Sequence, residues 1–209
     1  MHRRLLLIGF ASLLLSCASG PQVTKVQPLA KTSDAPYDNV LVISLANFFD
    51  VRRIFEDAIV DELEKRGIRA VASTSLMNVD TPAVRDTFLA MVDSLDSDAV
   101  LVTQLVSDAA TMKMKDMNPQ VSYNYAPTYD WNVWNVEQVE YVEPQGLNVT
   151  HDIVLATQLF SVRDLKPVWT IESRTEILDA YDRRGDISAV LDEARSIVSH
   201  LASDGALAP

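Results

Sequence analysis

The sequence has one cysteine and three histidines, and this scarcity excludes several kinds of chemistry. A lone Cys17 cannot build an internal disulfide framework. The chain also lacks a G-x-S-x-G nucleophile turn, a Walker phosphate loop, an H-E-x-x-H zinc motif and a glycine-rich dinucleotide turn. The sequence therefore carries none of the common signatures of hydrolases, nucleotide-binding proteins or zinc proteases.

Positive charge is also scarce. The chain has 18 Lys and Arg against 29 Asp and Glu, a formal net charge of -11, and no basic run follows residue 4. Binding to a phosphate backbone depends on clustered Lys and Arg, so the composition speaks against nucleic acid and against electrostatic docking on anionic lipid headgroups. The apolar fraction of 48% is that of an ordinary globular domain.

The amino-terminal segment is too short for a transmembrane helix. Residues 1–4 are basic, and residues 5–15 form an apolar run interrupted only by Gly9 and Ser12. As a helix this run would measure roughly 16 Å, whereas a bilayer core is ~30 Å thick. The pattern is typical of a secretory signal peptide.

The segment ends in Leu14-Leu15-Ser16-Cys17, which resembles the lipobox of bacterial lipoproteins. The resemblance implies cleavage before Cys17 and acylation of that residue, palmitate included, which would anchor the mature chain to a membrane. Ala18 is not the Asp that retains enteric lipoproteins at the inner membrane. The resemblance therefore implies the outer membrane, with the protein facing the periplasm.

We predict three segments along the chain. Residues 1–16 are the signal peptide, 17–36 the acylated cysteine with a flexible tether, and 37–205 a single domain. Residues 18–36 show neither helical nor strand period, and nineteen extended residues reach at most ~65 Å. Residues 107–148 are polar and aromatic, which predicts an insertion within the domain.

Short β-branched runs predict the strands of the domain. We expect strands over residues 40–45, 68–72 and 99–106, and an antiparallel pair over 149–162 and 168–178. In the last strand, period-two alternation predicts one buried face. That face holds Trp169, Ile171, Ser173, Thr175 and Ile177.

Amphipathic stretches predict three main helices. The first runs from an N-cap at Asn47 to a left-handed stop at Gly67, and the second begins at Thr81-Pro82. The third runs from a cap at Asp186 to the end of the domain. The core-facing stripe of the first helix is predicted to be Val51, Ile54, Phe55, Ala58, Ile59 and Leu63. Together these elements predict an α+β fold, a mixed β-sheet with helices packed on it.

The strand 40–45 with the helix 56–67, and the strand–turn–strand 160–169 ending in Lys-Pro-Val-Trp, are similar to those of two groups of lipoprotein domains. These are domains related to the amino-terminal domain of TolB, and the curli secretion lipoprotein. The resemblance implies a tethered envelope domain that acts as an accessory or assembly factor rather than an enzyme.

The histidines offer little for catalysis. His151 precedes Asp152, and a carboxylate can orient an imidazole for base catalysis. Neighbours in a strand point to opposite faces, so we expect these two side chains not to meet. His200 falls on the polar side of the last predicted helix.

Metal sites are equally weakly indicated. Thioethers suit Cu(I), but two lysines alternate with the methionines and disfavour a cation. The methionines are Met112, Met114 and Met117. Carboxylates at helical spacing are predicted to be a solvated helix face rather than a calcium site. These are Asp57, Asp61 and Glu64. We therefore expect neither a metal nor a cofactor.

Large aromatic residues are concentrated in the predicted insertion. They lie among Asn, Asp and Glu, with few aliphatic neighbours. They could be a contact surface for a partner, a lid over the sheet or a membrane-inserted hairpin. The candidate contact residues are Tyr123, Tyr125, Tyr129, Trp131 and Trp134. Asn side chains between the rings would be costly to bury, which favours the contact surface.

We accordingly expect a membrane-anchored periplasmic lipoprotein that is a non-enzymatic accessory or assembly factor, with another envelope protein as partner. The alternative is a subunit of an oligomeric outer-membrane secretion channel resembling the curli secretion lipoprotein. Glutamates on both faces of residues 133–143 speak against membrane strands there. An envelope hydrolase is the weakest alternative.

Overall fold

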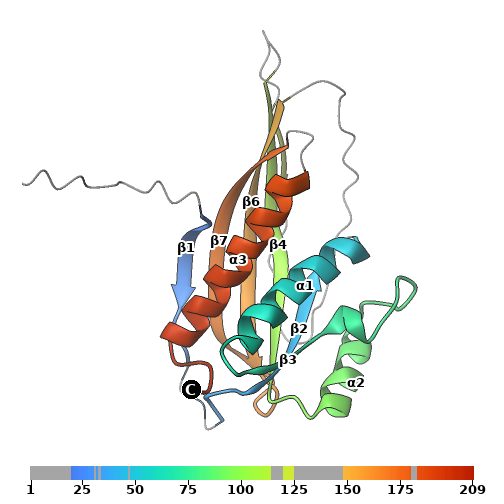
Figure 1. Ribbon diagram of the computed structural model, residues 1–209, viewed down its shortest axis with the longest axis vertical. Helices are drawn as coiled ribbons and strands as arrows, with labels where there is room; N and C mark the ends of the chain where they lie inside the picture. The colour runs from blue at the N-terminus through green and yellow to red at the C-terminus, as the bar shows by residue number, and fades with distance from the viewer. Residues whose placement is uncertain are drawn as a thin grey trace, which may run out of the picture.

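The computed structural model describes residues 20–30, 32, 34–46, 48–113, 120–124, 148–179 and 183–209 (Figure 1). Its elements follow in the order β1 (Gln22–Gln27), β2 (Asn39–Leu45), α1 (Phe49–Glu64), β3 (Arg69–Ala72), the 3₁₀ turn η1 (Ser73–Ser75), α2 (Arg85–Leu95), β4 (Ala99–Lys113), β5 (Gln120–Asn124), β6 (Asn148–Ser161), β7 (Lys166–Asp179) and α3 (Arg183–Ser203).

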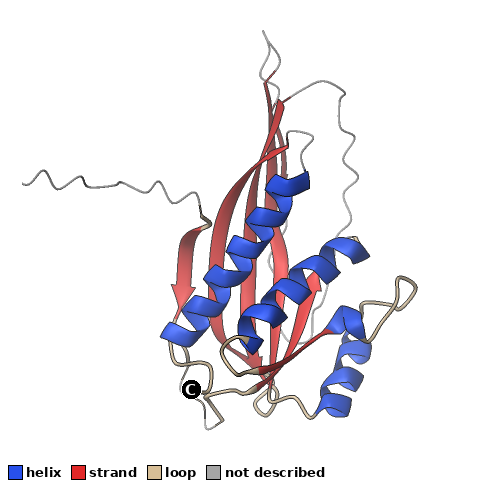
Figure 2. Ribbon diagram, in the orientation of Figure 1, coloured by secondary structure: helices blue, strands red, loops and turns tan. Residues whose placement is uncertain are grey.

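The strands form one mixed sheet with the order β1-β7-β6-β4-β2-β3 (Figure 2). β2 pairs in parallel with β3 and with β4, whereas β4, β6, β7 and β1 pair antiparallel in succession. β5 pairs with β4 at residues 107–111, on the edge that β2 leaves free after Gln104. The predicted α+β class, a mixed sheet carrying three helices, is confirmed.

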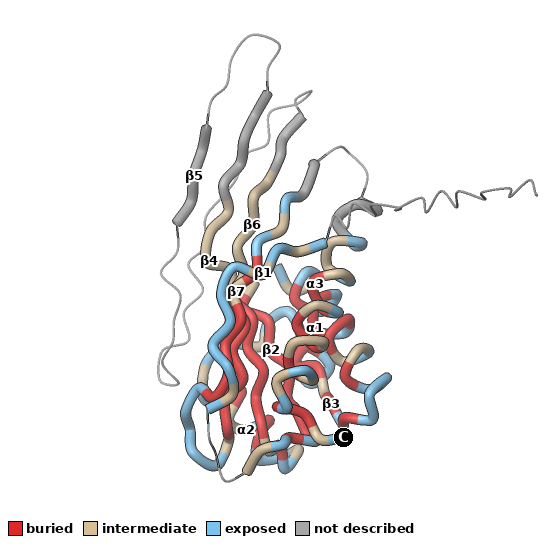
Figure 3. The backbone as a smooth tube through the Cα atoms, turned by 90° about the vertical axis from the view of Figure 1, so that its left-hand side faces the viewer, coloured by how far each residue is buried: buried red, intermediate tan, exposed pale blue. Residues whose placement is uncertain are grey.

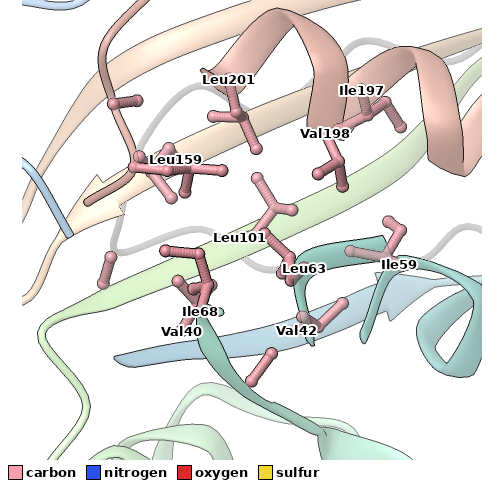
Figure 4. Close-up of a cluster of buried hydrophobic side chains, with 14 of the residues drawn as sticks. Val40, Val42, Ile59, Leu63, Ile68, Leu101, Leu159, Ile197, Val198 and Leu201 are labelled. Carbon is pink, nitrogen blue, oxygen red and sulfur yellow. The ribbon is translucent and has the colours of Figure 1, made fainter. Parts of the chain in front are cut away.

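The helices cover both faces of the sheet because β2 and β4 alternate their buried side chains. Val40, Val42 and Leu101 belong to the larger cluster, with α1 and α3. Figure 4 shows these side chains converging with Leu159 of β6 and Leu201 of α3. The smaller cluster lies on the opposite face, where α2 packs. It contains Leu41, Ile43, Leu45, Phe88, Met91, Val92, Val100, Val102 and Phe160. Figure 3 shows α1 and α3 together on one side of the sheet.

Several predicted boundaries and faces are confirmed. Gly67 and Gly205 have φ values of +81° and +73°, so both residues after the helix ends adopt the left-handed conformation that glycine tolerates. The predicted antiparallel pair is β6 with β7. Trp169 is buried in the larger cluster, and its Nε1 donates a hydrogen bond of 2.8 Å to Asp204 Oδ2.

The predicted tether over 17–36 is wrong for residues 22–27, which form the edge strand β1 on β7. Most residues of β1 are exposed, because an outer strand with solvent around it buries little apolar surface. Edge pairing of this kind leaves no alternating pattern in the sequence. The domain also begins before residue 37 and ends after 205, since the backbones of Tyr37 and Ala208 are hydrogen bonded.

Three helix predictions need correction. α2 starts at Arg85, not at Thr81-Pro82, because residues 78–81 form a turn in which Thr81 Oγ1 bonds Asn78. α3 already includes Asp186, the predicted cap. Asn47, the predicted cap of α1, lies outside the described residues. The insertion at 107–148 is also smaller than predicted, because β4 continues through Lys113 and β6 starts at Asn148.

Candidate functional site

Most of the residues nominated for lipidation and partner contact lie outside the described residues. This holds for Cys17, Tyr125, Tyr129, Trp131 and Trp134. Tyr123 lies in β5, where its backbone pairs with Asp108 of β4. The lipidation and aromatic-contact hypotheses therefore stay predictions.

His151 and Asp152 point to opposite faces of β6 and have different partners. His151 Nδ1 is 3.0 Å from Asp108 Oδ1, a diagonal neighbour on β4. Asp152 forms a bidentate pair with Arg174 of β7. His200 Nδ1 lies 2.8 Å from the Ser196 carbonyl oxygen, within α3. Both histidines thus have partners that build the fold.

Of the candidate metal ligands, the structure describes the backbone of one methionine and the carboxylates of α1. Met114 and Met117 lie outside the described residues, and Met112 lies within β4. Asp57 and Asp61 are exposed on α1, as the sequence predicts for a solvated face. In the part of the chain that the structure describes, no three His, Cys, Asp or Glu residues are placed to hold a metal ion. Nor does any described helix have the length and apolarity to cross a membrane.

Glu56 is a fully buried carboxylate on α1 that the sequence analysis missed. Its Oε1 accepts a hydrogen bond from the Ser44 backbone N–H at 2.8 Å, and its Oε2 accepts from the Thr74 N–H and Oγ1, both at 2.8 Å. Ser73 Oγ donates as well, at 2.9 Å. Burial raises the pKa of Glu56, and the hydrogen bonds from Ser44 and Thr74 oppose this effect. The carboxylate joins the carboxyl ends of β2 and β3 to α1.

Arg52 is buried one turn before Glu56. Its Nε donates to the Ser44 carbonyl oxygen at 2.9 Å, and its Nη2 lies 3.3 Å from Met77 Sδ. Burial lowers the pKa of Arg52, while the charge of Glu56 raises it. Arg52 and Glu56 lie at i and i+4 among the apolar residues of α1, a spacing that also fits a solvated helix face, so the sequence alone does not mark them as buried.

Glu193 of α3 is the second buried carboxylate that was missed, with 2% of its surface exposed. It accepts hydrogen bonds from Ser173 Oγ and, at 3.2 Å, from Thr175 Oγ1. Burial raises the pKa of Glu193, and the two hydroxyl groups oppose the shift. This contact fixes α3 over β7 and turns the Glu193 side of the helix toward that strand.

Asp34 forms a third network near the start of the domain. It accepts hydrogen bonds from Ser161 Oγ at 2.5 Å and from Tyr37 Oη at 3.1 Å. Burial opposes ionisation of Asp34, but these hydroxyl groups outweigh it and lower the pKa. All three carboxylates thus serve contacts between elements of the fold.

A pocket of about 260 Å³ lies beside β1, β6 and β7. Its polar lining includes Lys25, Gln158 and Thr170. Lys25 Nζ is 3.2 Å from Glu172 Oε1, and Gln158 Nε2 is 3.4 Å from Thr170 Oγ1. The lysine and the glutamine therefore already have protein partners.

An exposed apolar strip lies where α1 and α3 run side by side. Figure 1 shows the two helices parallel, and Arg66 Nη2 bonds Ser199 Oγ at 3.1 Å across them. Glu56 turns one side of α1 toward η1, so Val51 and Ile54 lie roughly on the opposite side, toward α3. Glu193 turns one side of α3 toward β7, so Ile187 and Leu191 lie toward α1.

We call this surface the seam strip and define it by five residues. They are Phe48, Val51, Ile54, Ile187 and Leu191, with exposed fractions of 70%, 48%, 43%, 47% and 45%. Val51 and Ile54 were predicted to be core residues, and that prediction is wrong, because the larger cluster is filled by their neighbours Phe55 and Ala58. Exposed apolar side chains gathered on two neighbouring helices are typical of an interaction surface.

Comparisons with known proteins show structural similarities at low sequence identity. A variant of the PelC dodecamer from Paraburkholderia phytofirmans has a TM-score of 0.48 and 13% identity, covering 86% of this chain and 96% of that one. Lipoprotein GNA1162 from Neisseria meningitidis has a TM-score of 0.42 and 11% identity, covering 79% and 98%. A minor lipoprotein from Acinetobacter baumannii has a TM-score of 0.37 and 8% identity, covering 80% and 94%.

Comparisons with protein families and with curated sequences find no match. The structural similarities are too low to assign a family or an activity.

Proposed function

We propose that the protein is a lipoprotein anchored at Cys17 in the outer membrane, facing the periplasm, and that it is a non-enzymatic accessory or assembly factor that binds another envelope protein. The seam strip carries this proposal. It leaves five large apolar side chains partly or largely exposed on the layer formed by α1 and α3. Burying them against a partner would recover the free energy that their exposure costs.

The carboxylate networks support a binding function rather than a catalytic one. Glu56, Glu193 and Asp34 are each bonded to backbone or hydroxyl groups of the domain itself. A catalytic carboxylate would need to reach a bound substrate. We include the aromatic residues 123–134 as a second contact surface in this proposal.

Replacing Cys17 by Ser tests the anchor. We expect the wild-type protein to sediment with outer-membrane vesicles in a sucrose gradient, because several acyl chains hold a protein far more firmly than one. The Cys17→Ser protein should be absent from the vesicles and from detergent extracts of the membrane. A Cys17→Ser protein that still cofractionates with the outer-membrane vesicles would contradict the lipid anchor.

A photo-crosslinking amino acid at Val51 tests the contact. We expect adducts with a second envelope protein in intact cells, and none from Leu165, an equally exposed apolar residue in the β6–β7 turn. A ladder of adducts between copies of this chain would favour the oligomeric channel instead. Equal yields from both positions would contradict a specific contact at the strip.

A further inference from the structure

We propose that the seam strip binds a positively charged amphipathic helix of the partner protein, with basic residues of that helix pairing with the acidic crest of α1. The inference rests on the proposed function, because it specifies the chemistry of the same partner. We define the acidic crest as Asp50, Asp57 and Asp61.

The shape of the strip fits a helix. Phe48 is the N-cap of α1 and has an extended backbone, and Val51 and Ile54 follow it at three-residue intervals, about 4.5 Å apart along the helix axis. Ile187 and Leu191 lie one turn apart on the neighbouring helix α3. A helix laid along two parallel helices presents apolar side chains at i, i+3 or i+4 and i+7, which is the spacing that such a strip can receive.

The negative charge of the acidic crest beside the seam strip favours a partner helix that carries positive charge. Asp50, Asp57 and Asp61 are all exposed on the solvent side of α1, and Ile54 lies beside them around the helix. Arg53 is exposed as well, but its Nη2 is already 3.0 Å from Asp50 Oδ1. Asp57 and Asp61 are one turn apart, so they match Lys or Arg residues one turn apart on a facing helix.

The same charges argue against other occupants. A second copy of this chain would bring an equal formal charge of -11 and the same acidic crest to the contact. An anionic membrane surface would be repelled as well. A basic helix would be stabilised both by apolar contacts with the seam strip and by ion pairs with the acidic crest. A second copy of this chain or an anionic membrane would be stabilised by the apolar contacts alone.

The chemistry of the crosslinked segment tests the inference. The full-length chain carries the photo-crosslinking amino acid at Val51 in intact cells, and adducts are digested and sequenced by mass spectrometry. We expect a partner peptide with net positive charge and apolar residues three or four positions apart. A net-negative peptide, a peptide of this chain or a phospholipid adduct would overturn the inference. No adduct above the Leu165 control would overturn the proposed function with it.

Neutralising the crest supplies a second, independent readout. The double change Asp57→Asn and Asp61→Asn should lower the adduct yield at Val51 roughly threefold to tenfold, since exposed charge pairs contribute little individually but act together. The matched control is Asp93→Asn with Asp164→Asn, two exposed aspartates outside the crest, and it should leave the yield unchanged. Equal yields from both double variants, with equal melting temperatures, would refute the role of the crest.

Discussion

The two buried glutamates should respond to the same substitution with very different losses of stability. Glu56→Gln and Glu193→Gln both replace one carboxylate oxygen by an amide NH₂ of nearly equal size. At Glu56, the two oxygens accept from two backbone N–H groups, those of Ser44 and Thr74. At Glu193, the contacts come from the Ser173 and Thr175 hydroxyl groups.

The expected magnitudes follow from the geometry of these donors. A backbone N–H cannot turn away, so one of the two N–H groups facing residue 56 would be left buried and unpaired, at a cost of about 1–3 kcal/mol. Loss of the charge-assisted bonds adds to this, and we expect Glu56→Gln to lower the free energy of unfolding by about 2–4 kcal/mol. A hydroxyl group can rotate and accept from an amide, so Glu193→Gln should cost less than about 1 kcal/mol at neutral pH.

Thermal unfolding followed by circular dichroism measures both variants. For a domain of this size, the Glu56→Gln change should lower the melting temperature by roughly 6–12 °C, whereas Glu193→Gln should shift it by less than about 4 °C. The reasoning fails if the two variants are equally destabilised, or if Glu193→Gln is the less stable of the two.

Three further predictions concern acid stability, the core and the aromatic residues. Because burial raises the pKa of Glu193 in the folded protein, this carboxyl contributes stability below its unfolded pKa of about 4.3, and the contribution is lost as the pH rises through the folded value. The stability advantage of wild type over Glu193→Gln should therefore shrink as the pH rises above about 4.3 in urea titrations at successive pH values, and a widening gap would contradict this sign. Trp169→Ala should lower the free energy of unfolding by ~3 to 5 kcal/mol, and an unchanged melting temperature would refute its role as a core anchor. Replacing Tyr125, Trp131 and Trp134 together by Ser should leave the melting temperature nearly unchanged but remove an in-cell crosslink, whereas a destabilised protein would favour the lid.

Local patterns predicted the parts of the fold that depend on neighbours in the chain. The strands β2, β3 and β4, the antiparallel β6–β7 pair, the buried side of Trp169 and the left-handed Gly67 each follow from a short stretch of residues. Helix starts were less predictable. The sequence predicted that α2 begins at Thr81-Pro82, but residues 78–81 form a turn and the helix begins only at Arg85.

The buried charges could not be predicted from the same patterns. Glu56 is hydrogen bonded by Ser44 near the end of β2 and by Thr74 after β3, which are 12 and 18 positions away in the sequence. A sequence reading of α1 therefore assigns Arg52 and Glu56 to the solvent, and assigns Val51 and Ile54 to the core. The seam strip could be recognised only from the structure, because the contacts of α1 with the sheet and with η1 show which side of the helix is buried.

If the chain is lipidated at Cys17 as proposed, strand β1 limits how far the domain can stand from the bilayer. With the proposed lipid at Cys17, only five positions separate the anchor from Gln22, the first residue paired with β7. Five extended residues reach at most ~18 Å, about a quarter of the distance available to the longer tether first predicted. A tether this short would restrict the rotation of the domain and would keep the β1 edge of the sheet close to the lipid headgroups. A partner helix would then have to bind within about one domain's diameter of the membrane surface. A Gly-Ser insert that lengthens residues 18–21 should therefore weaken binding of the partner without altering the fold.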